Sequence, residues 1–232
     1  MSPVALESAR HHFMDGLAPL PGPMAMLIGL AMLLAVLWEE MWALTQHAYV
    51  IAHEGSHALT GVSVGRKLGS VKLSMNKQGA VEGGTVTIGP KKGLGMVATG
   101  FSGYIGPSVF GLVAAKIIQL GYIQAVLWLA VILLVLLLLY TRSIRGIVSV
   151  VLAGGLVVLV LHQGEAGLET VTAYAISWFL LVSGVRVVLH HRTKAGDADI
   201  LKGQTGVPRT LWFVLWLAGS AAALWVGGGL LV

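Results

Sequence analysis

Long apolar runs alternate with short polar stretches along most of this chain. A polar, proline-punctuated arm at 1–22 precedes the first run, about Met24–Trp38, and Glu39 and Glu40 mark a bend before the second run, about Ala43–Val64. Five further apolar runs follow, at about 94–119, 122–140, 144–161, 170–189 and 208–231. About 20 apolar residues are enough for a helix to cross a bilayer. The pattern therefore predicts an all-α polytopic membrane protein with about seven transmembrane helices.

Residues 66–89, which follow the second predicted helix, have a different pattern. Apolar and polar residues alternate from Val71 to Met75, which is typical of a strand. The next four residues are turn formers, and Val81–Ile88 has the composition of a returning strand. We expect a small β-hairpin-like loop here, within a single transmembrane domain at 23–232; a disordered basic loop is the alternative.

The composition supports placement in a membrane. Hydrophobic residues make up 56% of the 232 residues and charged residues only 11%, whereas soluble domains average about 25% charged residues. The chain has no cysteine, so disulfides and thiolate ligands are excluded, and any metal must be bound by histidine and carboxylate. A net charge of +5 would suggest nucleic acid for a soluble protein, but here the basic residues lie in loops between apolar runs. We therefore expect contact with membrane lipid and no nucleic-acid partner.

The distribution of charge also predicts an orientation in the membrane. Basic residues gather in the loops at 66–92, 141–145 and 190–209, whereas the opposite loops contain Glu39, Glu40, Glu165 and Glu169 and no Lys or Arg. Loops rich in Lys and Arg remain in the cytoplasm. With seven spans, this rule puts the N-terminus in the cytoplasm and the C-terminus outside. The oligomeric state stays open.

The strongest candidate for chemistry is an HExxH motif, His53-Glu54-Gly55-Ser56-His57, in the second predicted helix. Residues four apart lie on one face of a helix, so His53 and His57 can present two imidazoles to one zinc ion. Glu54 is placed to take a proton from metal-bound water. A buried pair of histidines satisfied by hydrogen bonds is the alternative, but a His-Glu-His cluster in an apolar helix is costly without a partner. We therefore predict one Zn²⁺ per chain, with His53 and His57 as ligands and Glu54 as general base.

The predicted orientation puts this motif inside the membrane. His57 and His53 lie eight and twelve residues before Gly65, where the helix is expected to end. At 1.5 Å per residue they are roughly 12–18 Å from that end, within the cytoplasmic leaflet. A zinc site at this depth predicts hydrolysis inside the membrane.

At this point the chain resembles the site-2-type intramembrane zinc metalloproteases of peptidase family M50, particularly the compact bacterial M50B-like members. The resemblance rests on HEGSHAL in an early span, the glycine-rich strand-like loop after it, GYIGP at 103–107, and the late segment Gly196–Leu201. In the family, a distant aspartate completes the zinc ligands. The resemblance therefore implies Asp197 as third ligand, with Asp199 as a competitor and a solvated loop carboxylate as the alternative reading of Asp197. It also implies an integral protein of the bacterial cytoplasmic membrane.

The resemblance implies an enzyme, a zinc metalloendopeptidase that cuts membrane-spanning protein substrates in regulated intramembrane proteolysis. A pseudoprotease or membrane scaffold is the alternative, which the intact Glu54 disfavours. A metal-ion transporter is a third reading, disfavoured because the third to fifth spans contain almost no histidine or carboxylate. A substrate helix must unwind before cleavage, and an exposed strand within 70–88 is expected to hold the unwound segment by strand addition.

Overall fold

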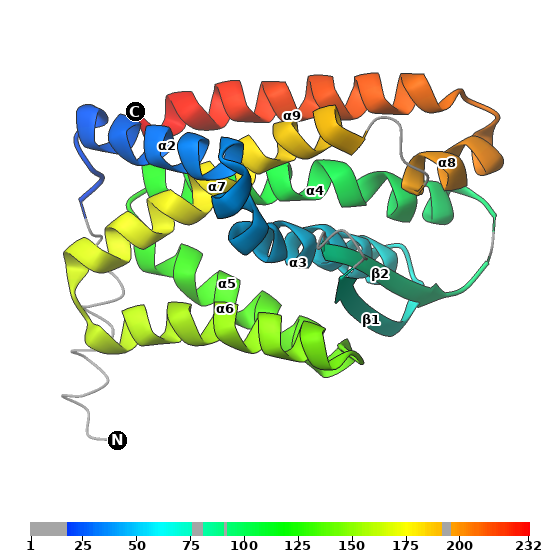
Figure 1. The fold of residues 1–232 in the computed structure, drawn as a ribbon, viewed down its shortest axis with the longest axis horizontal. Coiled ribbons are helices and arrows are strands. Elements are labelled where there is room, and N and C mark those ends of the chain that lie inside the picture. Colours follow the sequence, from blue (N-terminus) through cyan, green and yellow to red (C-terminus); the bar gives the residue numbers. More distant parts are fainter. Residues whose placement is uncertain (1–17, 76–80, 91, 192–195) are drawn as a thin grey trace.

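The computed structural model describes residues 18–75, 81–90, 92–191 and 196–232. It is a bundle of helices with one two-stranded antiparallel sheet at its end (Figure 1). In chain order the elements are α2 (Gly22–Leu37), α3 (Glu39–Ser63), β1 (Lys67–Met75), β2 (Val81–Ile88), α4 (Leu94–Gln119), α5 (Ile123–Tyr140), α6 (Ile144–Gln163), α7 (Ala166–His191), α8 (Asp197–Thr205) and α9 (Arg209–Leu231). The predicted helical membrane fold and the predicted strands are confirmed, while the turn expected between the strands falls largely outside the described residues.

The number of membrane spans differs from the prediction. Five described helices, α4, α5, α6, α7 and α9, are each long and apolar enough to cross a bilayer. Helices α2 and α3 pass that test only as a pair, which is bent by 101°. Helix α2 has 16 residues, about 24 Å at 1.5 Å per residue, and is too short to cross alone. The described residues therefore contain five candidate spans, or six if the bent pair is one span, and the count of seven is not confirmed.

The two ends of the bundle are not arranged as seven spans would require. A Cβ on Gly22 would lie 3.1 Å from the carbonyl oxygen of Val232, and the Leu20 N–H donates to the Tyr174 hydroxyl at 3.1 Å. The start of α2 and the end of α9 thus meet at the end of the bundle opposite the hairpin (Figure 1). The predicted separation of the chain ends across the membrane is wrong for residues 22 and 232, because α2 and α3 together advance only once along the bundle.

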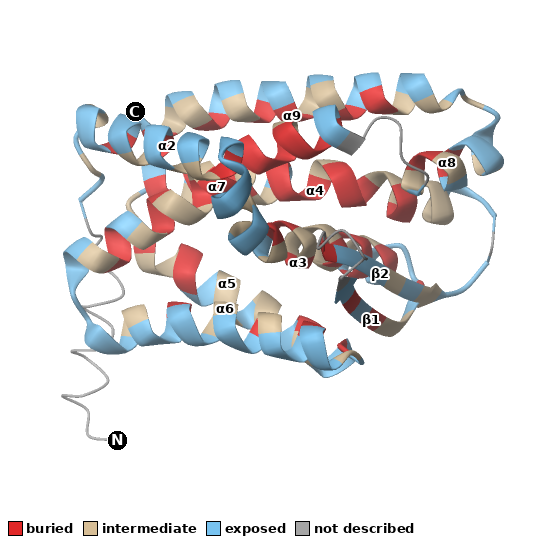
Figure 2. Cartoon of the chain, in the orientation of Figure 1, coloured by how far each residue is buried: buried red, intermediate tan, exposed pale blue. Residues whose placement is uncertain are grey.

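Helices α4 and α7 form the centre of the bundle, where the buried residues are concentrated (Figure 2). Helix α4 runs without interruption past Pro107, so this proline does not mark the start of a span. The small residues around it allow close helix approach. A Cβ on Gly106 would overlap the side chain of Ser56 in α3. This contact brings α3, with its HExxH motif, directly against α4.

The hairpin lies along α3, and only one of its edges is open. On β1, Val71 accepts a hydrogen bond from the Arg142 N–H at 2.8 Å, and the Leu73 N–H donates to the Ser143 hydroxyl at 2.9 Å. The segment between α5 and α6 therefore covers the outer edge of β1. On β2, the Val81 N–H donates to the side chain of Gln46 at 3.1 Å. Near the other end of β2 the Thr87 carbonyl accepts a hydrogen bond from Arg66 at 3.4 Å. Between these two contacts, no backbone group of another described segment pairs with the outer edge of β2.

Candidate metal centre

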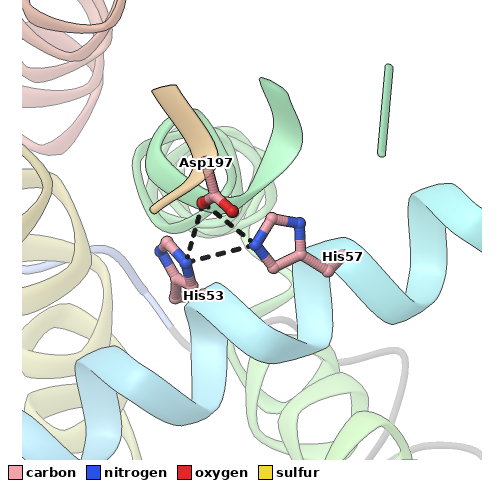
Figure 3. A group of neighbouring side chains, drawn as sticks. All are labelled: His53, His57 and Asp197. Carbon is pink, nitrogen blue, oxygen red and sulfur yellow. Dashed lines mark hydrogen bonds and ion pairs between the residues drawn. The ribbon is translucent and has the colours of Figure 1, made fainter. Parts of the chain in front are cut away.

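Three predicted site residues from two distant elements converge in the structure. His53 and His57 lie on successive turns of α3 and point toward Asp197, the first residue of α8 (Figure 3). The two Nε2 atoms are 3.2 Å apart, and Asp197 Oδ2 lies 3.3 Å from Nε2 of His53 and 3.2 Å from Nε2 of His57. These three ligand atoms therefore form a nearly equilateral triangle.

The size of this triangle suits a zinc ion. Zinc binds imidazole nitrogen and carboxylate oxygen at about 2.0–2.1 Å with tetrahedral geometry, which separates neighbouring ligand atoms by about 3.3 Å. The observed separations of 3.2, 3.2 and 3.3 Å match one face of such a tetrahedron. Two imidazoles and one carboxylate also leave a fourth position open, as catalytic zinc sites do. The donor set and its spacing therefore fit the group that the sequence predicted.

His57 is held in the tautomer that a metal ligand requires. Its Nδ1 lies 2.6 Å from the carbonyl oxygen of Thr99 in α4. A carbonyl oxygen only accepts hydrogen bonds, so Nδ1 carries a proton, and Nε2, which faces Asp197, is the nitrogen left to bind a metal. Within the described residues, Nδ1 of His53 is buried and has no such partner.

Asp197 is not the solvated loop carboxylate that was the alternative to a metal ligand. It begins the short helix α8, which is anchored by Leu201 and Ala198, both almost fully buried. Burial disfavours a charged carboxylate, but the hydrogen bonds from His53 and His57 outweigh this effect and hold the pKa of Asp197 well below its usual range. The residue is therefore anionic at neutral pH, as a carboxylate ligand must be.

Asp199, the competing candidate, has other partners. One of its carboxylate oxygens accepts a hydrogen bond from the Gly196 N–H at 3.3 Å, and the other lies 3.1 Å from Nε of Arg209. Asp199 thus caps the start of α8 and ties it to α9. The structure brings Asp197 to the histidine pair and leaves Asp199 outside the group of ligand atoms.

Glu54 is buried, with 3% of its surface exposed, and faces the hairpin. The Thr85 hydroxyl in β2 lies 2.7 Å from Oε2 of Glu54 and 3.1 Å from its backbone carbonyl, so it can donate to either. Gly83 lets the carboxylate lie this close to β2, since a Cβ there would overlap the Glu54 side chain. The hairpin therefore fixes the carboxylate of the HExxH motif.

Gly103 of α4 closes the centre from the other side. A Cβ there would lie 2.5 Å from Cε1 of His57 and 2.7 Å from Cε1 of His53, closer than real side chains approach. The GYIGP segment, which contributed to the resemblance, thus packs directly on the two imidazoles.

We expect Gly103→Ala to displace the imidazoles and to lower zinc affinity by about tenfold or more, as changes next to metal ligands do. Gly155→Ala is the matched control, because a Cβ at Gly155 meets open space and alanine favours the helix. Chelator competition on the two purified variants makes the measurement. Equal zinc affinity in both would contradict the close packing of α4 on the ligands.

Comparison with known proteins bears on what this centre does. The family model described as Peptidase M50B-like matches residues 26–227, which is most of the chain. The chain belongs to the Peptidase M50B-like family. The resemblance inferred from the sequence is therefore confirmed. No curated protein and no solved structure matches the chain.

Membership of the M50B-like family indicates a metallopeptidase embedded in a membrane, and the M50 family is zinc-dependent in general. The matched residues include α3 and α8, which carry the candidate metal group. Sequence reasoning missed Thr85 and the Thr99 carbonyl. The Gly83-Gly84 pair in β2 was a signal for close approach to another group, whereas no sequence signal identifies a backbone carbonyl as a partner.

Proposed function

We propose that this M50B-like chain is an intramembrane zinc endopeptidase that hydrolyses peptide bonds of membrane-spanning proteins. The observation that carries the proposal is the convergence of His53, His57 and Asp197 at zinc-ligand spacing. The next residue in the chain after His53 is Glu54, a buried carboxylate. A scaffold that keeps the metal site would have no need of this carboxylate.

In this proposal, His53, His57 and Asp197 hold the zinc ion and Glu54 moves the proton. A bound zinc ion supplies Lewis-acid chemistry, lowering the pKa of water to about 7 and polarising a carbonyl. Glu54 accepts the proton of the attacking water at its carboxylate and delivers it to the leaving nitrogen. Thr85 holds Oε2 of Glu54 in one orientation, and the Thr99 carbonyl fixes the tautomer of His57.

The open edge of β2 is where we place the extended substrate segment. Val71 and Leu73 direct their backbone groups away from β2, and they pair with Thr85 and Gly83 respectively. In an antiparallel pair, opposite residues point their groups outward together, so Gly83 and Thr85 present theirs at the outer edge of β2. In the described part of the chain no backbone group pairs with these outward-facing groups. An unwound substrate that adds there lies beside Glu54, whereas the covered edge of β1 is closed to it.

The same end of the bundle is where we place the cytoplasm. Positive charges flank the hairpin and the α5–α6 segment and continue into α8 and the start of α9, namely Arg66, Lys67, Lys72, Arg142, Arg145, Lys202 and Arg209. By the positive-inside rule, this end faces the cytoplasm and the metal group lies toward the cytoplasmic leaflet. Gly22 and Val232 then lie at the outer side, which replaces the earlier expectation for the start of the first helix.

We expect Thr85→Val to lower kcat by about tenfold or more while KM and zinc content stay unchanged. Valine keeps the shape of threonine but removes the donor to a buried carboxylate, and a hydrogen bond to a charged group contributes about 1.5–3 kcal/mol. Thr85→Ser, which keeps the hydroxyl, should recover most of the rate. Steady-state cleavage of a single-span substrate measures both variants; equal losses in the two would show that only packing matters at this position.

The proposed function is tested by zinc content and cleavage together. The full chain, purified in detergent, should contain about one zinc per chain and cut a co-expressed single-span protein. A chelator should stop cleavage, and added Zn²⁺ should restore it. Zinc without cleavage of any of a panel of single-span proteins would favour a scaffold that keeps the metal site. A chain without zinc would overturn the proposal.

A further inference from the structure

A second concave site lies on the opposite side of α3 from the metal group. It is a groove of about 550 Å³ between the first half of α3, the hairpin and α6. From α3 it is lined by Leu44, Ala48 and Ile51, among others. At 100° per residue these three positions form one stripe of the helix, and His53 and His57 lie about half a turn away. A molecule in the groove is therefore separated from the metal group by α3 itself.

Apart from His47 on α3, the walls of the groove beyond its basic end are apolar, and they are open to the bilayer. Along α6 they include Leu152 and Leu156, which are 63% and 66% exposed in a helix that is apolar enough to span a membrane. From Arg145 to Leu156 the groove follows α6 for 11 residues, about 16 Å at 1.5 Å per residue. A spanning helix, about 10 Å across and about 30 Å long, fills on the order of 2,000 Å³. The groove is therefore too small for a helix and suits a single hydrocarbon chain.

One end of the groove is polar and positively charged. Arg145 and Ser149 of α6 line it beside Ser74 of β1. Arg145 lies in the first turn of α6, at the basic end of the bundle, and exposed Lys72 and Arg142 lie in the adjoining strand and loop. Glu82, opposite Ser74 in the register, is the acidic residue of this part of the hairpin. The charge at this end is therefore net positive and lies where a spanning helix begins.

We propose that the groove binds one anionic membrane phospholipid, with an acyl chain along α3 and α6 and the phosphate at Arg145. Arginine is suited to phosphate because its planar guanidinium donates two parallel hydrogen bonds. Basic residues at a membrane surface also attract anionic lipid by about 1 kcal/mol each. The bound lipid packs against the side of α3 that faces away from the metal group and does not reach that group. This inference therefore does not depend on the proposed protease activity.

The test is native mass spectrometry of the full chain in detergent with added phosphatidylglycerol or phosphatidylcholine. Wild type should retain one phosphatidylglycerol per chain and bind phosphatidylcholine several-fold more weakly. Arg145→Gln should weaken phosphatidylglycerol binding by about tenfold. Arg142→Gln is the matched control, since Arg142 is exposed three residues before Arg145 but does not line the groove; it should weaken phosphatidylglycerol binding clearly less than Arg145→Gln does, because it removes only the general attraction of a surface charge.

Ala48→Phe tests the groove itself. Ala48 is exposed, so the larger side chain fills the groove without disturbing the core, and bound lipid should be lost while thermal unfolding without lipid stays unchanged. Retention of phosphatidylglycerol by Ala48→Phe, or equal losses in the two arginine variants, would overturn the proposal. The chain has no cysteine, so a photo-crosslinker on Ser149→Cys reports the occupant directly: a lipid adduct is expected, and a peptide adduct in its place would overturn the proposal.

Discussion

Glu54→Gln is expected to abolish detectable cleavage, with a loss of at least about 100-fold, while zinc content stays at the wild-type level. Glutamine has nearly the same shape as glutamate and still accepts the hydrogen bond from Thr85, but it cannot accept a proton from water. Removal of a general base typically costs 10²–10⁴-fold. Zinc is retained because the ligand triangle is made by His53, His57 and Asp197. Single-turnover cleavage and metal analysis on the same preparation measure both effects.

Glu165→Gln, the same change in the segment between α6 and α7, provides the control and should leave both quantities unchanged. A Glu54→Gln variant that cuts at the wild-type rate would remove Glu54 from the role of base. Loss of zinc together with activity would instead show that Glu54 supports the metal site.

Asp197→Ala is expected to lower zinc affinity by more than about 100-fold and to remove cleavage with it. The change deletes one corner of the ligand triangle and leaves two imidazoles whose Nε2 atoms are 3.2 Å apart. The loss of zinc affinity on removing a ligand should exceed the 10–100-fold loss that is typical when a residue that only supports a ligand is changed. Chelator competition at equal protein concentration gives the affinity of each variant.

Asp199→Ala, two residues further along the chain, distinguishes the role of a metal ligand from the role of a residue that positions the ligand. It removes the contacts with Gly196 and Arg209 but not the carboxylate that meets the histidines. Zinc affinity should fall about tenfold at most, which is within the range for a supporting residue. If Asp199→Ala cost more than Asp197→Ala, the two aspartates would exchange roles.

Much of the helical framework is encoded locally and was predictable. The apolar run at 94–119 is α4, and the run at 208–231 is α9 to within one residue. Period-two alternation located the second half of β1, and the residues after the expected turn located β2. The spacing of HExxH placed His53 and His57 on one face because helix geometry is local. Asp197 came only through the resemblance, since no local rule joins residues 140 positions apart.

What the sequence did not predict depends on how distant elements pack. The partner of His57 is a backbone carbonyl on α4, and the partner of Glu54 is a hydroxyl on β2. Both pairings form only because α3 packs against α4 and β2. Packing between distant elements leaves no periodic pattern in the sequence from which it could be predicted. The count of seven spans was not confirmed for a related reason. The first two apolar runs predicted two membrane crossings, whereas the break at Trp38 joins α2 and α3 into one bent pair.

If β2 holds the substrate and Glu54 is the base, as proposed, the hydrogen bond between Thr85 and Glu54 makes one strand responsible for both recognition and chemistry. A substrate segment that pairs poorly with β2 shifts Thr85, and with it the orientation of the group that moves the proton. Such a segment is held but cut slowly, because the correct alignment is reached only when pairing is complete. Discrimination between substrates should then appear in the turnover rate of the bound complex, with binding strength a poor guide to which proteins are cut.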